Sequence, residues 1–335
     1  MSVLVTGGAG YIGSHMVLEL LDAGETVVVL DDLSTGLVWA VPRGATFVTG
    51  DVGDQDLVRH ILESQGVDAI IHFAGSIVVP DSVADPLGYY LNNTVKSRAL
   101  MEMAVSCAVP HFIFSSTAAV YGMTGAEPVA EDAALAPMSP YGSSKRMTEI
   151  MLADTALAHE LRYVALRYFN VAGADPKGRS GQSTPRATHL IKVACETALA
   201  KRSHMQVFGT DYPTPDGTCL RDYIHVTDLT RAHMAALRHL RAGGTSDILN
   251  CGYGRGFSVL EVIDAVKRAA GREFEVRLSA RRPGDPARVV AASERIRRTL
   301  AWVPEHDTLD AIVRSALSWE TGLSSLQNAQ SAGAA

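Results

Sequence analysis

The sequence lacks several features that point to particular classes of protein. It has four cysteines in 335 residues, far apart and without a C-x-x-C pair, so neither a disulfide framework nor a metal site is predicted. Its net charge of −6 provides no basic field for a nucleic acid or an anionic membrane. It contains no apolar run long enough for a membrane span and no signal peptide. We therefore expect a cytoplasmic protein that binds neither nucleic acid nor membrane.

What the chain does have begins with a glycine-rich turn near its start. An apolar run over 2–6 reads as a buried strand, and apolar residues at helical spacing follow the turn. Between them, GAGYIG at 8–13 matches G-x-G-x-x-G. Glycines in such a turn let the main chain approach a pyrophosphate, and the helix N-terminus offers it free N–H groups. The pattern predicts a dinucleotide site that includes Gly7, Gly10 and Gly13.

An acidic residue follows the second strand-like run, at Asp31. An acid in this place accepts hydrogen bonds from the adenosine ribose hydroxyls and repels a 2′-phosphate. No arginine follows it before Arg43. The predicted cofactor is therefore NAD and not NADP.

Strand-like runs alternate with helical stretches through the first half of the chain, which is typical of a parallel sheet covered on both faces. We predict an α/β fold with a doubly wound parallel sheet (Rossmann) and a second, smaller α/β substrate domain. Further strands are expected over 45–50, 68–75 and 111–117. Asp51 would either contact adenine or, like Asp54, cap a helix. His72 lies inside an apolar strand and is interpreted as a core residue.

Three residues have the chemistry of acid–base catalysis. The strand over 111–117 ends in hydroxyls, the last on Thr117, and Ser139 opens a helix with Tyr141 and Lys145 one turn apart. A phenol is a weak base at its ordinary pKa of about 10, but a neighbouring ammonium group stabilises the phenolate. Such hydroxyls often cap loops, and such Tyr and Lys pairs occur on helix surfaces. Beside a dinucleotide turn, however, they predict a catalytic set.

With these residues in view, the sequence resembles the extended short-chain dehydrogenase/reductase family, and within it the UDP-glucose 4-epimerases, from residue 1 to about 319. The stretches that carry the resemblance are GGAGYIG, HFAGS, FSSTAAVYG, SPYGSSK, LRYFNVAGA, VFGTDYPTPDGTCLRDYIHVTDL and RRPGD. The resemblance implies reversible inversion at C4 of a UDP-hexose, through a transient 4-keto sugar and with NAD kept bound. It also implies a homodimer formed through helices over 88–107 and 141–160.

The resemblance assigns roles that the pattern alone does not. It makes Tyr141 the catalytic base, with Lys145 and Thr117 as its partners. The residues implied to contact NAD are Gly7, Gly10, Tyr11, Ile12, Gly13, Asp31, Asp32, Asp51, Val52, Phe73, Asn92, Tyr141, Lys145 and Phe169. The residues implied to contact the UDP-sugar are Thr117, Asn170, Gln206, Val207, Phe208, Arg221, Arg282, Asp285 and Val289. Arginines suit a diphosphate because a guanidinium pairs bidentately with phosphate oxygens, although Arg221 beside Asp222 also fits a surface ion pair.

Several positions depart from the pattern of the family. Ile77 stands where members carry a lysine beside the cofactor, His189 stands where they carry an asparagine, and Thr117 replaces a common serine. Val289 stands where a tyrosine restricts some members to plain hexoses. A smaller side chain there leads us to expect activity on an N-acetylated sugar as well.

The expected organisation is an NAD domain over 1–170, a mainly substrate domain over 171–322 and a disordered tail over 323–335. Part of 228–252 is expected to return to the first domain.

Other functions remain open on the sequence. Within the family these are a nucleotide-sugar dehydratase and a 4-epimerase of a UDP-pentose or a UDP-N-acetylhexosamine. A dehydratase needs a further acid and base directly after Thr117, where this chain has Ala118 and Ala119. Outside the family's chemistry, a regulatory protein that senses NAD without turnover would lack the Tyr141 and Lys145 pair.

Overall fold

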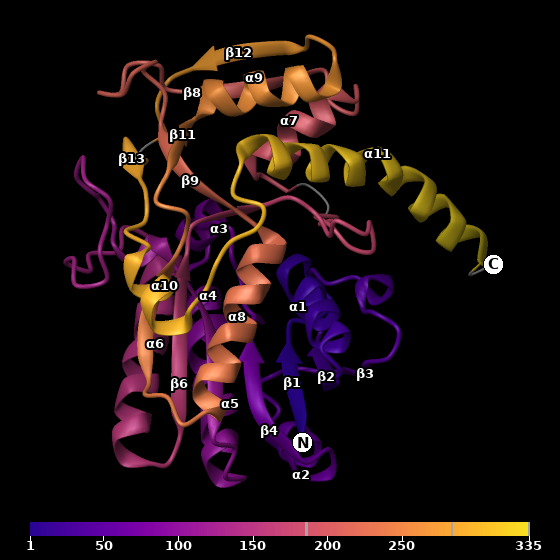
Figure 1. The fold of residues 1–335 in the computed structure, drawn as a ribbon, viewed down its shortest axis with the longest axis vertical. Helices are drawn as coiled ribbons and strands as arrows, with labels where there is room; N and C mark the ends of the chain where they lie inside the picture. Colours follow the sequence, from indigo (N-terminus) through magenta and orange to yellow (C-terminus); the bar gives the residue numbers. More distant parts are fainter. Residues whose placement is uncertain (185–186, 283, 334–335) are drawn as a thin grey trace.

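The computed structural model describes residues 1–184, 187–282 and 284–333, with side chains up to Leu323. Its largest element is a seven-stranded parallel sheet in the order β10-β6-β5-β4-β1-β2-β3 (Figure 1). The strands are β1 (Ser2–Thr6), β2 (Thr26–Asp31), β3 (Thr46–Thr49), β4 (Val67–His72), β5 (His111–Thr117), β6 (Arg162–Tyr168) and β10 (Asp247–Cys251). The predicted α/β fold with a doubly wound parallel sheet is confirmed.

Helices cover both faces of this sheet. The first face is covered by α1 (Tyr11–Asp22), α8 (Val226–Arg241) and α10 (Glu294–Leu300), and the second by α2 (Gln55–Ser64), α5 (Lys96–Ser106) and α6 (Pro140–Ala158). Ile113 of β5 faces the first group, and its neighbours Phe112 and Phe114 face the second. Because both of their faces are buried, the inner strands are continuous apolar runs that the sequence pattern indicates. The edge strand β3 is only partly buried.

Short elements lie in the connections between these strands. They are η1 (Val38–Ala40), α3 (Val79–Ala84), α4 (Pro86–Tyr90), the π-helical turn η2 (Leu91–Val95) and η3 (Ala118–Val120). The helix expected over 88–107 is therefore interrupted by a π-helical turn. Such turns are common at functional sites, and this one carries Asn92 and Asn93.

A second group of elements stands at the carboxyl edge of the large sheet. One four-stranded sheet contains β7 (Asn170–Ala172), β9 (Leu220–His225), β11 (Gly256–Ser258) and β13 (Arg288–Val289), and a two-stranded sheet contains β8 (His204–Phe208) and β12 (Glu275–Ser279). The helices that pack with them are α7 (Leu190–Ala198), α9 (Val259–Ala270) and α11 (Leu309–Gly333) (Figure 1). Because β7 follows β6 and β9 leads into α8, this group lies where the parallel strands end.

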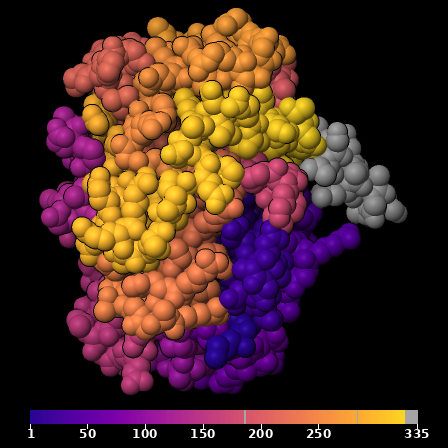
Figure 2. All heavy atoms as spheres, in the orientation of Figure 1, coloured from indigo at the N-terminus to yellow at the C-terminus, as the bar shows by residue number. Residues whose placement is uncertain are grey.

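The chain passes between the two groups more than once. β10 pairs with β6, so residues 247–251 lie in the large sheet. The segment after β7 packs against α1, where the Tyr11 hydroxyl donates to the Gly173 carbonyl at 2.6 Å and the Asp175 N–H donates to His15 at 3.1 Å. Figure 2 shows this segment against the indigo N-terminal residues.

The C-terminal helix α11 packs against the rest of the molecule as far as Leu323. Leu323 is buried beside Trp319. The predicted disorder of the rest of 323–335 falls on residues whose side chains lie outside the described part. Among the described residues, no helix is both long enough and apolar enough to cross a membrane.

Candidate active site

The glycine turn brings the start of α1 close to the end of β1. Gly7 has φ +72°, and a Cβ there would lie 2.6 Å from the backbone nitrogen of Ala74. A Cβ on Gly13 would lie 2.1 Å from the Gly7 carbonyl oxygen. Gly10 precedes the helix, and Ile12 packs on the core of the first face. The close approach that only glycine permits is thus present, and the turn fits a dinucleotide diphosphate.

Asp31 ends β2 beside this turn. Its two carboxylate oxygens accept from the Ala9 and Leu33 N–H groups, both at 2.9 Å. Burial raises the pKa of Asp31, and these two hydrogen bonds oppose the rise. Each oxygen retains a lone pair for a ribose hydroxyl, so the site fits NAD. The neighbouring Asp32 is exposed and accepts from the Ser34 N–H at 2.9 Å.

At Asp51 the sequence left two interpretations open. The residue that caps α2 is Asp54, whose side chain accepts from the Leu57 N–H at 3.1 Å. Asp51 instead forms an ion pair with Lys96 at 2.5 Å, which contributes to its lowered pKa. The pair borders an open hollow of about 360 Å³. The Val52 side chain is buried in the core, so Val52 can meet a ligand only through its backbone.

Beyond β4, two asparagines of the π-helical turn hold the strand end. The Asn92 side chain donates to the Ser76 hydroxyl at 2.9 Å. Asn93 is buried, accepts from the Ser76 N–H at 2.7 Å and donates to the Ser144 hydroxyl of α6 at 3.0 Å. Sequence reasoning assigned a role to Asn92 and missed Asn93, whose links between β4 and α6 are visible only in three dimensions. Phe73 lies nearby, with its ring centroid 4.9 Å from that of His233.

The helix that carries the predicted base begins as expected. Ser139 caps α6 by accepting from the Gly142 N–H at 3.2 Å, and Pro140 is its first residue. This start turns Tyr141 toward the end of β5, where Thr117 is located. Burial raises the pKa of Tyr141, whereas a contact with the Thr117 side chain acts to lower it. The Thr117 hydroxyl also accepts from the Ala119 N–H at 3.1 Å.

Lys145 lies one turn further along α6 and is also buried. Its Nζ donates to the Ser115 carbonyl at 3.0 Å and lies 4.9 Å from the Phe114 ring centroid. Burial lowers the pKa of Lys145 to about 8, and the charge of Glu149 opposes this shift. At neutral pH the group is therefore mainly an ammonium ion. Tyr141, Lys145 and Thr117 thus all lie at the end of β5, where Tyr141 contacts Thr117 and Lys145 contacts the Ser115 carbonyl.

His72 agrees with its interpretation as a core residue. Its ring nitrogens are bonded to the Thr6 and Ser97 hydroxyls at 2.7 Å and 2.8 Å. Burial lowers its pKa to about 3, so the ring is neutral. Among the described residues, no group of three or more His, Cys, Asp or Glu side chains is arranged to hold a metal ion.

The predicted substrate residues form two contacts above the sheet edge. Arg221 of β9 lies 3.3 Å from Asp285, and β9 pairs Arg221 with Val289 of β13. The Arg282 guanidinium stands 3.8 Å from the Phe208 ring centroid. Two cations and one carboxylate are thus grouped as a nucleoside diphosphate requires. Arg221 is not a surface ion pair with Asp222, because Asp222 is buried and accepts from the Tyr253, Gly254 and Ala291 N–H groups.

Other predicted residues are placed differently. The Val207 side chain is buried in the core of the second group, so only its backbone can face a ligand, whereas Gln206 beside it is exposed. Asn170 opens β7 with an exposed side chain, and Phe169 before it is buried. Of the departures from the family pattern, Ile77 is exposed. His189 precedes the first residue of α7, makes no capping hydrogen bond through its side chain, and contacts Gln182 at 3.3 Å.

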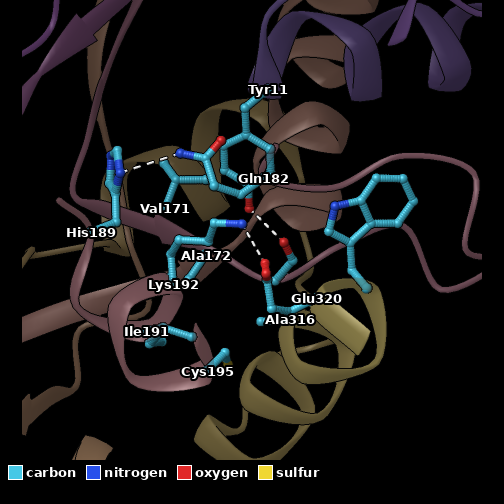
Figure 3. Close-up of a pocket in the computed structure, with 12 residues that line it drawn as sticks. Tyr11, Val171, Ala172, Gln182, His189, Ile191, Lys192, Cys195, Ala316 and Glu320 are labelled. Carbon is cyan, nitrogen blue, oxygen red and sulfur yellow. Dashed lines mark hydrogen bonds and ion pairs between the residues drawn. The ribbon is translucent and has the colours of Figure 1, made fainter. Parts of the chain in front are cut away.

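A small cavity lies between Tyr11, α7 and α11 (Figure 3). Its volume is about 20 Å³, roughly the space of one water molecule, so it is not the place of a nucleotide-sugar. Lys192 at its wall is ion-paired with Glu320.

Comparisons with known proteins agree with this geometry. The model of the NAD dependent epimerase/dehydratase family matches residues 3–252. A UDP-glucose 4-epimerase of Azospirillum brasilense is 56% identical over 321 residues, which cover 96% of this chain and 92% of that protein. A UDP-glucose 4-epimerase of Bifidobacterium longum, solved with NAD+ and UDP, superposes with a TM-score of 0.90 at 36% identity, covering 96% and 98% of the two chains. A UDP-Glc/GlcNAc 4-epimerase of Campylobacter jejuni gives a TM-score of 0.84 at 46% identity, covering 96% and 99%.

Proposed function

Because the chain belongs to the NAD dependent epimerase/dehydratase family, we propose that it inverts C4 of a UDP-hexose reversibly, interconverting UDP-glucose and UDP-galactose. The observation that carries this proposal is the buried meeting of Tyr141, Lys145 and Thr117 at the carboxyl end of β5. Ligands of parallel sheets bind at this edge.

NAD would be held by the glycine turn and Asp31, and it supplies the chemistry of accepting a hydride at C4 and returning it. The Tyr141 oxygen takes the proton of the sugar 4-hydroxyl and later gives it back. Burial disfavours the phenolate form of Tyr141. The Lys145 ammonium, one turn further along α6, would stabilise that form. The Thr117 hydroxyl bonds the same sugar oxygen and keeps it in line with the base.

Inversion also requires that the hexose turn over while the nucleotide stays fixed. Arg221 and Arg282 would bind the diphosphate, and Asp285 would accept from a ribose hydroxyl. These groups hold the UDP end only, so the 4-keto sugar can present its other face. Gln206 and Phe208 on β8 and Asn170 on β7 would line the remainder of the site.

The division of the chain follows from this arrangement. We propose an NAD domain over 1–170 and a mainly substrate-binding domain over 171–322, with α8 and β10 belonging to the first. The pairing of β10 with β6 supports this return. A dehydratase is not favoured, because Ala118 and Ala119 offer neither the acid nor the base that elimination needs.

Protein purified without added nucleotide should convert UDP-galactose to UDP-glucose with no NAD in the assay. Denaturing it should release about one NAD per chain and almost no NADP, because Asp31 disfavours a 2′-phosphate. Chromatography of the products and of the released nucleotide measures both. Absence of conversion would overturn the proposed reaction, and predominant NADP would overturn the role of Asp31.

We further propose a homodimer that works in the cytoplasm. Apolar side chains are exposed along two neighbouring stretches of the second face: Leu87, Leu91 and Val95, and on α6 Met147, Ile150 and Leu157. Covering such an exposed apolar surface with a second copy of the chain would be favourable. For the separate question of compartment, the four free cysteines suit a reducing environment. Sedimentation should give twice the chain mass, and Leu91→Glu with Ile150→Glu should give monomers; a monomeric wild type would contradict the proposal.

Val289 concerns the range of sugars. Val289 is a partly buried residue of β13 and pairs with Arg221 of β9. A tyrosine at position 289 would extend an aromatic ring into the space beside Arg221. We expect the wild type to act on UDP-N-acetylglucosamine as well as UDP-glucose, and Val289→Tyr to lower the ratio of the two kcat/KM values about tenfold or more. Val289→Ile is the control and should change the ratio little. An inert wild type, or an unchanged ratio in the tyrosine variant, would show that Val289 does not limit the pocket.

A further inference from the structure

A third buried residue continues the catalytic face of α6. Tyr141, Lys145 and Glu149 follow one another at one-turn intervals, and all three are buried. Glu149 lies one turn beyond Lys145 and has no part in the reaction described above. A buried carboxylate needs a partner, which Glu149 finds in Arg167 of β6. Arg167 donates through Nε to Oε1 at 2.9 Å and through Nη2 to Oε2 at 2.8 Å, and both side chains are 3% exposed.

The pair is tied directly to the strand that carries Thr117. The Ser116 hydroxyl donates to Glu149 Oε1 at 2.5 Å, and Ser116 lies opposite Arg167 in the register of β5 and β6. Lys145 donates to the carbonyl of Ser115, the preceding residue. α6 therefore contacts the end of β5 at two points, the Ser115 carbonyl through Lys145 and the Ser116 hydroxyl through Glu149.

Arg167 is itself fixed from the other side. Its Nη1 donates to the Tyr121 hydroxyl at 3.0 Å and to the Glu131 carbonyl at 3.2 Å, and the guanidinium lies 5.0 Å from the Tyr121 ring centroid. Tyr121 in turn donates to Asn250 of β10 at 2.6 Å. The guanidinium therefore has a single orientation, which fixes the carboxylate of Glu149 as well.

Few other charged groups lie near Tyr141, Lys145 and the Glu149–Arg167 pair. The other titratable groups around Tyr141 and Lys145 come from four elements: His72 on β4, His233 on α8, Tyr89 on α4 and Tyr168 on β6. Tyr163, at the start of β6, lies near the pair itself. Burial lowers the pKa of His72 to about 3 and that of His233 to about 4, and it raises the pKa of the tyrosines. These histidines and tyrosines are uncharged at neutral pH. A further carboxylate, that of Glu131, accepts from the Asn250 N–H at 2.9 Å and acts on Tyr121, and it is present in every variant compared below. The opposite charges of Glu149 and Arg167 neutralise one another, and removing either side chain's charge would leave the other buried without a counter-charge.

We propose that Glu149 and Arg167 form a positioning pair that holds the catalytic face of α6 against the end of β5 and balances the charge around Tyr141 and Lys145. The proposal rests on the proposed function, in which Tyr141 is the base and Lys145 its ammonium partner. The pair touches neither sugar nor cofactor and acts through these two residues.

The test compares the pH dependence of kcat/KM in single and double variants of the NAD-loaded protein. The two limbs report the coupled ionisation of Tyr141 and Lys145. Glu149→Gln leaves the charge of Arg167 unbalanced, and a positive charge favours the deprotonated form of both groups, so both limbs should move about one unit toward acid. Arg167→Leu should move both toward alkali. Glu149→Gln with Arg167→Leu should return them to within a few tenths of wild type, because the removed charges cancel.

Two further variants separate position from charge. Arg167→Lys keeps the charge and loses the two-pronged contact, so it should lower kcat while the limbs stay in place. Asp68→Asn breaks a two-pronged, partly buried pair with Arg241, which has contacts of 2.8 Å and 2.9 Å at the other end of the sheet. This control should lower the unfolding temperature and leave the pH profile unchanged. If Glu149→Gln does not fold, the alkaline shift of Arg167→Leu and its absence in Arg167→Lys still decide.

A second measurement does not depend on epimerase activity. The near-ultraviolet absorbance of tyrosinate is followed against pH in each variant and in the same variant with Tyr141→Phe, and the difference gives the ionisation of Tyr141. It should shift in the same directions as the ascending limb. Without activity in the wild type the proposed function fails, and this titration alone decides on the pair. Losses of stability or rate with unmoved limbs, or shifts of one sign in both single variants, would reduce the pair to a structural role.

Discussion

Replacing Tyr141 by phenylalanine should leave the fold and the bound NAD in place and lower turnover of UDP-galactose by at least about two orders of magnitude. The change removes one oxygen from a buried side chain, so its packing is retained, but the group proposed to move the proton is lost. A positioned acid or base contributes about 10²- to 10⁴-fold to a rate. Turnover is measured with saturating substrate, and NAD content is measured on the same preparation.

Two companion variants make this result specific. Thr117→Val should cost about tenfold, because it removes one hydrogen bond and leaves the base. Tyr163→Phe, at a buried tyrosine elsewhere in the sheet, should change turnover less than about twofold. Near-normal activity of Tyr141→Phe would remove Tyr141 from the mechanism. An equal or greater loss of turnover in Thr117→Val would show that Thr117, and not Tyr141, is the group that moves the proton.

Replacing Arg221 by methionine should raise KM for UDP-galactose about 30- to 150-fold and change kcat little. Arg221 is largely buried beside Asp285, and a hydrogen bond to a charged group in such a place contributes roughly 2–3 kcal/mol. The guanidinium would contact the diphosphate and not the reacting carbon, so its loss weakens the substrate complex and its transition state together.

Arg277→Met provides the matched control. Arg277 is an exposed arginine of β12 paired with Glu275 at 2.7 Å, so the variant removes the same charge from the molecule at a distance from the proposed site. It should leave KM and kcat at wild-type values. A fall in kcat with KM unchanged in Arg221→Met would contradict the proposed role of Arg221 in substrate binding.

The parts of the fold that depend on local pattern could be predicted from the sequence. β5 covers His111–Thr117 as expected, because a strand buried on both faces is a continuous apolar run. The start of α6 at Ser139 and Pro140 could be predicted because a helix cap is a property of adjacent residues. The fold class and the catalytic candidates follow from such signals.

The parts that depend on distant partners could not be predicted. Asn93 is one residue from an assigned position, yet its bonds run to Ser76 and Ser144 in other elements. Glu149 has a visible spacing from Lys145, but its partner Arg167 lies on a strand that only the sheet order brings beside α6. The π-helical turn carries no local signal that distinguishes it from an ordinary helix, and the inward turn of Val207 depends on the packing of α7 and α9. The assignments of individual residues to NAD and to the sugar remain predictions.

The repeated passage of the chain between the two groups bears on how the molecule folds. A piece ending at residue 170 would lack α8 and β10, and would leave Ile113, Val164 and Leu166 without the apolar cover of Leu229, Ala232 and Leu249. The last strand of the large sheet, β10, therefore follows in the chain after residues 171–225, most of which belong to the smaller group. Because residues on both sides of 171–225 contribute to the same core, we expect the two groups to unfold in one cooperative transition.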